Sequence, residues 1–93
     1  MIRDLDAIRA RIDEVDERLV RLIDQRAALV REAAALKAAR GAPLLDPARE
    51  EAILRRAAAL AALPEPAVRA AFTGILDACK LAIDPSAPEE PHP

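Results

Sequence analysis

Apolar side chains recur at alternating spacings of three and four residues along the first third of the chain. We name these positions the seam, and its members are Leu5, Ile8, Ile12, Val15, Leu19, Leu22, Arg26, Leu29, Ala33 and Leu36. A repeat of this kind, sustained over more than four heptads, is typical of a helix that packs along another helix. Because no Gly or Pro occurs before Gly41–Pro43, we expect one long helix over about residues 3–39.

Two shorter helices are predicted after this break. Asp46 is placed to cap the second helix and Pro47 to occupy its first turn. This helix ends before Pro64, and we expect it to direct inward Ile53, Leu54, Ala57, Leu60 and Ala61. The third helix begins near residues 64–66 and ends at residues 84–85, and its expected inward side chains are Val68, Phe72, Ile75, Leu76, Cys79 and Ile83.

The pattern predicts an all-α fold of one long and two shorter helices, because alternation typical of strands is not seen. We expect residues 1–84 to form one helical domain. Residues 85–93 lack any periodicity, and we expect them to form a disordered tail.

The length of the first helix predicts a second chain. A helix over residues 3–39 is about 55 Å long, whereas a compact 93-residue globule is only about 32 Å across. The seam continues along the overhang, where exposed apolar surface costs about 25 cal/mol per Å². We therefore expect an intertwined homodimer with isologous symmetry.

The composition argues against several classes of function. The chain is 53% hydrophobic and 32% charged, with a net charge of −2 and Phe72 as its one aromatic residue. Neither a basic field nor a base-stacking surface is present, so nucleic acid is not an expected partner. With one cysteine, Cys79, and one histidine, His92, we expect no internal disulfide, no metal and no cofactor. The N-terminal segment is charged from residue 3 onward, which favours a cytoplasmic protein without a signal peptide or membrane span.

Two cations share one stripe of the long helix. Arg26 interrupts the seam, and Lys37 lies eleven residues later, within about 20° of the same direction. Arg26 can be interpreted as a side chain that extends to solvent, or as a half-buried guanidinium that awaits an anion. Lys37 can likewise be a solvated residue near a helix C-terminus, where the helix dipole favours a cation.

Further charged residues complete a candidate cationic pocket. Arg9 lies about a quarter turn from the Arg26 stripe, so it is either a surface arginine or a group that reaches the pocket of a partner chain. Asp46, Arg49 and Glu50 begin the second helix, where acidic residues commonly cap and stabilise the N-terminus. A pocket that gathers these cations suits a small dianion.

The segment AIRARIDEVDERLVRLIDQRAALV, followed by Lys37 and then APLLDPAREEAIL, resembles the AroQ-type, all-helical chorismate mutases of type II. The resemblance covers residues 5–83. It implies three helices per chain that interlock into a homodimer. The implied activity is an isomerase that converts chorismate to prephenate in phenylalanine and tyrosine biosynthesis.

The resemblance also implies roles for the candidate residues. Arg9 reaches across the dimer to a substrate carboxylate, and Arg26 binds the other carboxylate region from its own chain. Lys37 is directed at the ether oxygen of the breaking C–O bond. Arg49 supports a carboxylate, while Glu50 and the region of Asp46 hold the ring hydroxyl.

The third helix departs from the family pattern. The family carries a serine and, four residues later, a glutamine or glutamate that donates to the ether oxygen. Counting from Phe72, these positions are Cys79 and Ile83. A register shifted by one residue would instead offer Lys80 and Asp84, and this alternative is less favoured. A thiol is only a weak donor, and an isoleucine side chain makes no hydrogen bond.

Two kinds of alternative to the mutase remain, enzymes on the same scaffold and a noncatalytic module. On the same scaffold, an isochorismate-pyruvate lyase or an amino-deoxychorismate mutase would use a similar cationic pocket. A noncatalytic helical dimerisation module would also explain the heptads, with Arg26 setting the register. The order of Arg26, Lys37, Asp46, Arg49 and Glu50 argues against that module.

Overall fold

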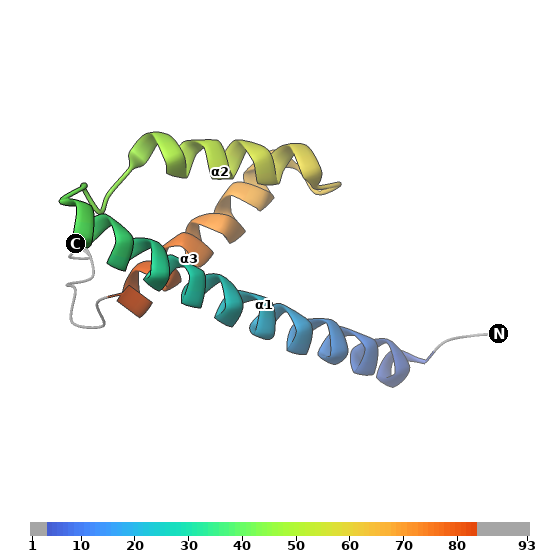
Figure 1. Ribbon diagram of the computed structural model, residues 1–93. Coiled ribbons are helices and arrows are strands. Elements are labelled where there is room, and N and C mark those ends of the chain that lie inside the picture. The colour runs from blue at the N-terminus through green and yellow to red at the C-terminus, as the bar shows by residue number, and fades with distance from the viewer. Residues whose placement is uncertain (1–3, 84–93) are drawn as a thin grey trace, which may run out of the picture.

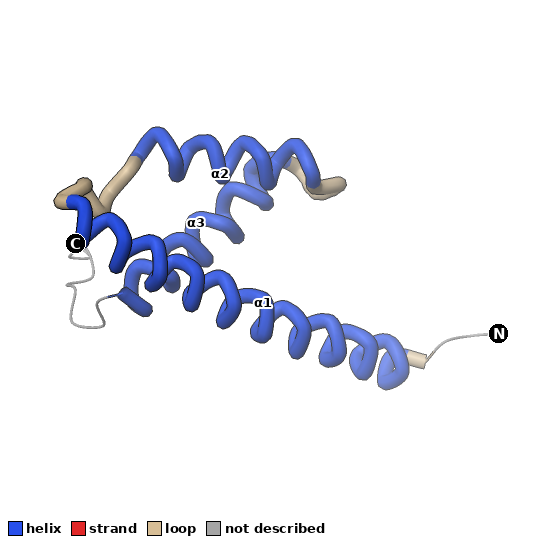
Figure 2. Tube along the Cα trace, in the orientation of Figure 1, coloured by secondary structure: helices blue, strands red, loops and turns tan. Residues whose placement is uncertain are grey.

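The computed structural model describes residues 4–83, and these form three helices with no strand among them. Helix α1 spans Leu5–Arg40, α2 spans Pro47–Leu60 and α3 spans Glu65–Ile83 (Figure 2). The predicted all-α class, with one long and two shorter helices, is confirmed. The disordered tail expected at residues 85–93 lies outside the described residues.

The helix ends follow the signals in the sequence. Asp4 caps α1 by accepting a hydrogen bond from the Ala7 backbone N–H at 2.7 Å. Gly41 ends it in the left-handed region, at φ 67, where a residue without Cβ is favoured. Asp46 caps α2 and Pro47 occupies its first position, as predicted.

The three helices form an elongated molecule. Figure 1 shows α2 and α3 beside the C-terminal half of α1, while its N-terminal half extends away from both. The molecule measures 60 × 31 × 24 Å and has a radius of gyration of 16.7 Å, against about 12 Å for a compact domain of this length. Within the described chain, α3 is the helix that packs against both others.

The core is small and lies on α3. Val68, Leu76 and Cys79 are the buried apolar residues of the described chain. The expectation that Leu60 and Ala61 point inward is wrong. Leu60 is 76% exposed because α2 ends there, and Ala61 has an extended backbone that takes it off the helix face.

Helix α1 carries two apolar stripes rather than one. We name the second the packed stripe; its half-buried members are Ile23, Arg26, Ala27, Val30, Ala34 and Lys37. It faces α3, the helix that contacts α1. Over the same turns, the seam residues Leu22, Leu29 and Leu36 are exposed. The two stripes lie roughly 100° apart around the helix, and Arg26 lies on their shared border.

Candidate functional site

Arg26 is held where α1 crosses α3. Its Nη1 donates a hydrogen bond to Cys79 Sγ at 3.2 Å. Cys79 is the most buried residue among those described, at 2% exposure, and its thiol is free. The guanidinium is therefore anchored at one edge, while its remaining N–H groups are available to a ligand.

Lys37 connects the end of α1 to the loop that follows. Its Nζ donates to the Leu44 backbone carbonyl at 3.3 Å. The Gly41 turn closes the end of α1, where the Ala42 N–H bonds to the Lys37 carbonyl at 2.9 Å. Lys37 is half-buried and lies on the packed stripe with Arg26, about three helical turns away.

The first turn of α2 carries three of the predicted site residues. Asp46 Oδ1 accepts a hydrogen bond from the Arg49 backbone N–H at 3.0 Å. This is the capping role that the residue type favours. Arg49 is exposed, whereas Glu50 is half-buried.

Glu50 is paired with a cation from α3. Lys80 Nζ lies 3.2 Å from Glu50 Oε1 and 3.1 Å from Oε2. The sequence offered Lys80 only as the alternative to Cys79 in a register shifted by one residue, and it did not predict this pairing with Glu50. One signal was available, because Lys37 and Lys80 are the two lysines in a chain with 14 basic residues.

The structure does not bring all predicted residues together within one chain. Arg9 is exposed on the overhanging half of α1, about 25 Å along the helix from Arg26. Ile83 is half-buried at the end of α3 and has no polar side-chain atom. One chain therefore groups Arg26 with Cys79, Lys37 with the loop, and Glu50 with Lys80.

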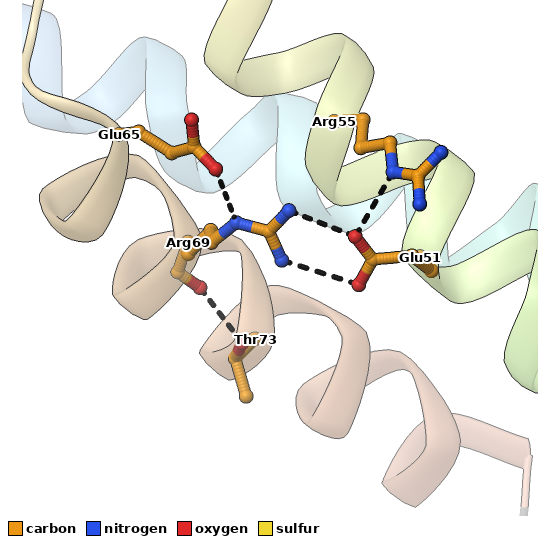
Figure 3. Close-up of polar contacts among 5 residues, drawn as sticks. All are labelled: Glu51, Arg55, Glu65, Arg69 and Thr73. Carbon is orange, nitrogen blue, oxygen red and sulfur yellow. Dashed lines mark hydrogen bonds and ion pairs between the residues drawn. The ribbon is translucent and has the colours of Figure 1, made fainter.

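A separate ion cluster joins α2 to α3. Arg69 donates to both carboxylate oxygens of Glu51, at 3.1 and 2.8 Å, and its Nε donates to Glu65 at 2.8 Å (Figure 3). Arg55 adds a further hydrogen bond to Glu51 at 3.2 Å. The hydrogen bonds from Arg69, aided by its charge and by Arg55, lower the pKa of Glu51 to about 2. The bidentate geometry favours a fixed alignment of the two helices that carry Glu50 and Lys80.

Half-buried cations fall into two groups. Four Lys or Arg residues of the described chain are half-buried: Arg26, Lys37, Arg69 and Lys80. Arg69 and Lys80 have carboxylate partners, whereas no carboxylate of residues 4–83 lies within ion-pair distance of Arg26 or Lys37. Partly desolvated cations without a counter-charge are suited to bind an anionic ligand.

The described residues contain neither a metal-binding cluster nor a helix that could span a membrane. No group of three or more His, Cys, Asp and Glu residues within positions 4–83 is arranged to hold a metal ion. None of the three helices has a stretch that is long and apolar enough to cross a membrane.

Comparison with known proteins agrees with the all-helical fold. Residues 8–82 match the family model described as chorismate mutase type II. A chorismate mutase of Methanocaldococcus jannaschii is 41% identical over 56 residues, which are 60% of this chain and 57% of that protein. Form I of the Thermus thermophilus chorismate mutase has 32% identity and a TM-score of 0.76, covering 81% of this chain and 96% of that one. Form II has 30% identity and a TM-score of 0.79, with coverages of 91% and 98%.

Proposed function

Because the chain belongs to the type II chorismate mutase family, we propose that it rearranges chorismate to prephenate in the cytoplasmic synthesis of phenylalanine and tyrosine. The observation that carries this proposal is the pair of half-buried cations without carboxylate partners among residues 4–83, Arg26 and Lys37. Chorismate is a dianion, and such cations favour its two carboxylates and its ether oxygen. The free thiol of Cys79 is compatible with a reducing compartment.

The rearrangement is unimolecular and pericyclic, so it requires neither a nucleophile nor an acid–base pair. Arg26 and Arg49 bind carboxylate groups and hold the enolpyruvyl arm over the ring, which supplies a near-attack geometry. Lys37 stabilises the negative charge that grows on the ether oxygen as the C–O bond lengthens. Glu50 accepts a hydrogen bond from the ring hydroxyl, and Asp46 fixes the backbone that presents Arg49 and Glu50.

The site is proposed to be completed by a second copy of the chain. The exposed seam of α1 is the surface that this copy covers, because it leaves large apolar side chains such as Ile12, Leu19 and Leu29 in water. Arg26 lies on the border between the seam and the packed stripe, so it faces the junction of the two chains. In an antiparallel dimer, the distant Arg9 then serves the site of the partner.

Cys79 and Ile83 form the end of the proposed site that comes from α3. Cys79 accepts a hydrogen bond from Arg26 and so positions the guanidinium that binds the substrate. Ile83 contributes an apolar wall where the family places a side chain that donates to the ether oxygen. Lys37 therefore carries most of the stabilisation of that oxygen.

The test is the loss of chorismate, followed by its absorbance, with the purified protein. We expect turnover to prephenate. Arg26→Ala and Lys37→Ala should each lower kcat by about 10²–10³, the usual effect of removing one donor to developing charge. Arg31→Ala, at an exposed position on the same helix, is the matched control and should keep full activity.

A helical, dimeric protein that leaves chorismate unchanged would refute the proposal. Isochorismate and amino-deoxychorismate would then be assayed in the same way. Turnover of either would assign the chain to a related reaction, and inactivity with all three would favour a noncatalytic dimerisation module.

A further inference from the structure

The contact between Lys80 and Glu50 links α3 to the proposed site. Lys80 Nζ is nearly equidistant from the two carboxylate oxygens of Glu50, at 3.2 and 3.1 Å. Both side chains are partly shielded from water, at 43% and 32% exposure. A cation centred on a carboxylate restricts its rotation and balances its charge.

The neighbours of this pair show that Lys80 is directed mainly at Glu50. Among the described residues, the one other carboxylate near Lys80 is Asp77, at 3.9 Å and more exposed. Within residues 4–83, Lys80 is also the one cation within ion-pair distance of Glu50. The preceding residue, Cys79, contacts Arg26 of α1. Two consecutive residues of α3 therefore contact proposed substrate-binding residues on the two other helices.

A carboxylate in a site for a dianion raises an electrostatic problem. An unpaired Glu50 repels both carboxylates of the substrate, and the repulsion is strong where water is partly excluded. Glu50 is nevertheless needed as an acceptor for the ring hydroxyl. A lysine bound to the carboxylate removes the net charge while it leaves lone pairs free to accept that hydrogen bond.

We propose, on the basis of the function proposed above, that Lys80 is a positioning residue that fixes and neutralises Glu50 so that the site accepts a hydroxylated dianion. Lys80 acts through Glu50 and does not itself touch the substrate. Its effect is therefore on substrate affinity more than on the chemical step.

The test is a set of variants at the two positions, assayed with chorismate. Lys80→Met keeps most of the length of the side chain but removes its charge. It should raise KM about tenfold, or about 1.4 kcal/mol, with kcat changed less than about threefold. Lys80→Arg should restore KM. Adding Glu50→Gln to Lys80→Met should also lower KM again, because the uncompensated charge is then gone.

Two controls separate this role from a general effect on charge or folding. Arg55→Met removes a cation of similar length from α2 that contacts Glu51 rather than Glu50, and it should leave KM unchanged. Asp77→Asn removes the weaker partner of Lys80 and should have no effect on KM. Lys80→Gln provides a polar alternative to Lys80→Met, with helicity followed by circular dichroism.

Binding of malate, a dianion that carries a hydroxyl group, gives a readout that does not depend on turnover. Lys80→Met should weaken malate binding about tenfold in an NMR titration, in parallel with KM. The proposal is overturned if Lys80→Met leaves both KM and malate affinity within twofold of the wild type. It is also overturned if Glu50→Gln fails to reverse the defect, since Lys80 would then bind the ligand directly. Absence of chorismate turnover by the wild type would instead refute the proposed mutase activity.

Discussion

The two halves of α1 share the heptad seam but have different surroundings. The N-terminal half, residues 5–20, presents its seam to solvent, with Ile12 at 51% exposure. It also extends away from the other two helices (Figure 1). The C-terminal half packs one stripe against α3 and still leaves Leu22, Leu29 and Leu36 of the seam exposed.

This difference distinguishes stability that comes from packing within the chain from stability that requires a second chain. The packed stripe is covered by α3 of the same chain. The seam has a repeat suited to packing against another helix, but no helix within residues 4–83 covers it. With three buried apolar residues in the described chain, the single chain lacks the core that domains of this length need. Arg26 lies where the two surfaces meet, and the proposed site therefore depends on both.

The largest effect is expected from a charge placed in the N-terminal half of the seam. Ile12→Glu buries a carboxylate in the proposed interface, and it should weaken the dimer at least about 100-fold, or about 2.8 kcal/mol. Sedimentation equilibrium over a range of concentrations measures this change. The matched control is Ala10→Glu, which places the same charge on roughly the opposite side of the helix and should leave the dimer intact. Equal dimer stability in the two variants would argue against the seam as the interface.

A smaller effect is expected in the C-terminal half, at the contact between Cys79 and Arg26. Cys79→Val removes the acceptor of a charged donor, which should lower kcat/KM about tenfold because Arg26 loses its anchor. Cys79→Ser keeps an acceptor of similar position and should retain kcat/KM within about threefold. Steady-state kinetics with chorismate distinguishes the two variants. Full activity in Cys79→Val would mean that packing alone orients Arg26.

The smallest effect concerns the ion cluster of Glu51, Arg55, Glu65 and Arg69 that joins α2 to α3. The pKa of Glu51 is lowered from 4.5 to about 2, so its pairing contributes stability that is present above about pH 4.5 and is lost as the pH falls toward 2. Glu51→Gln should therefore lower Tm at pH 6, and the difference from the wild type should shrink as the pH approaches 2. Thermal unfolding followed by circular dichroism measures both.

Glu17→Gln provides the control for this pH dependence. Glu17 and Arg21 form an exposed pair at 3.9 Å, which should contribute little to stability at any pH. A Tm difference for Glu51→Gln that stays constant from pH 6 to pH 2 would contradict the role assigned to the cluster.

The sequence predicted the helices well because their boundaries depend on local chemistry. Asp46 and Pro47 begin α2, and Gly41 ends α1, through backbone geometry that neighbouring residues specify. The stripe of Arg26 and Lys37 was also predictable, since it follows from 100° per residue.

The packing partners were less predictable, because periodicity shows which face is apolar and not what covers it. The heptads predicted one seam, and the structure has a second stripe at Ile23, Ala27 and Val30 that packs on α3. The pairing of Lys80 with Glu50 was missed because Glu50 lies 30 residues away on another helix. Leu60 was misassigned because the apolar pattern continues past the residue at which α2 ends.

The most direct test of the shared site is complementation between two inactive variants. Arg9→Ala and Arg26→Ala are each purified, unfolded, mixed in equal amounts and refolded. If every site takes Arg9 from one chain and Arg26 from the other, half of the dimers are mixed and each has one intact site, so about a quarter of the wild-type activity should return. A mixture that stays as inactive as its two components would contradict the shared site.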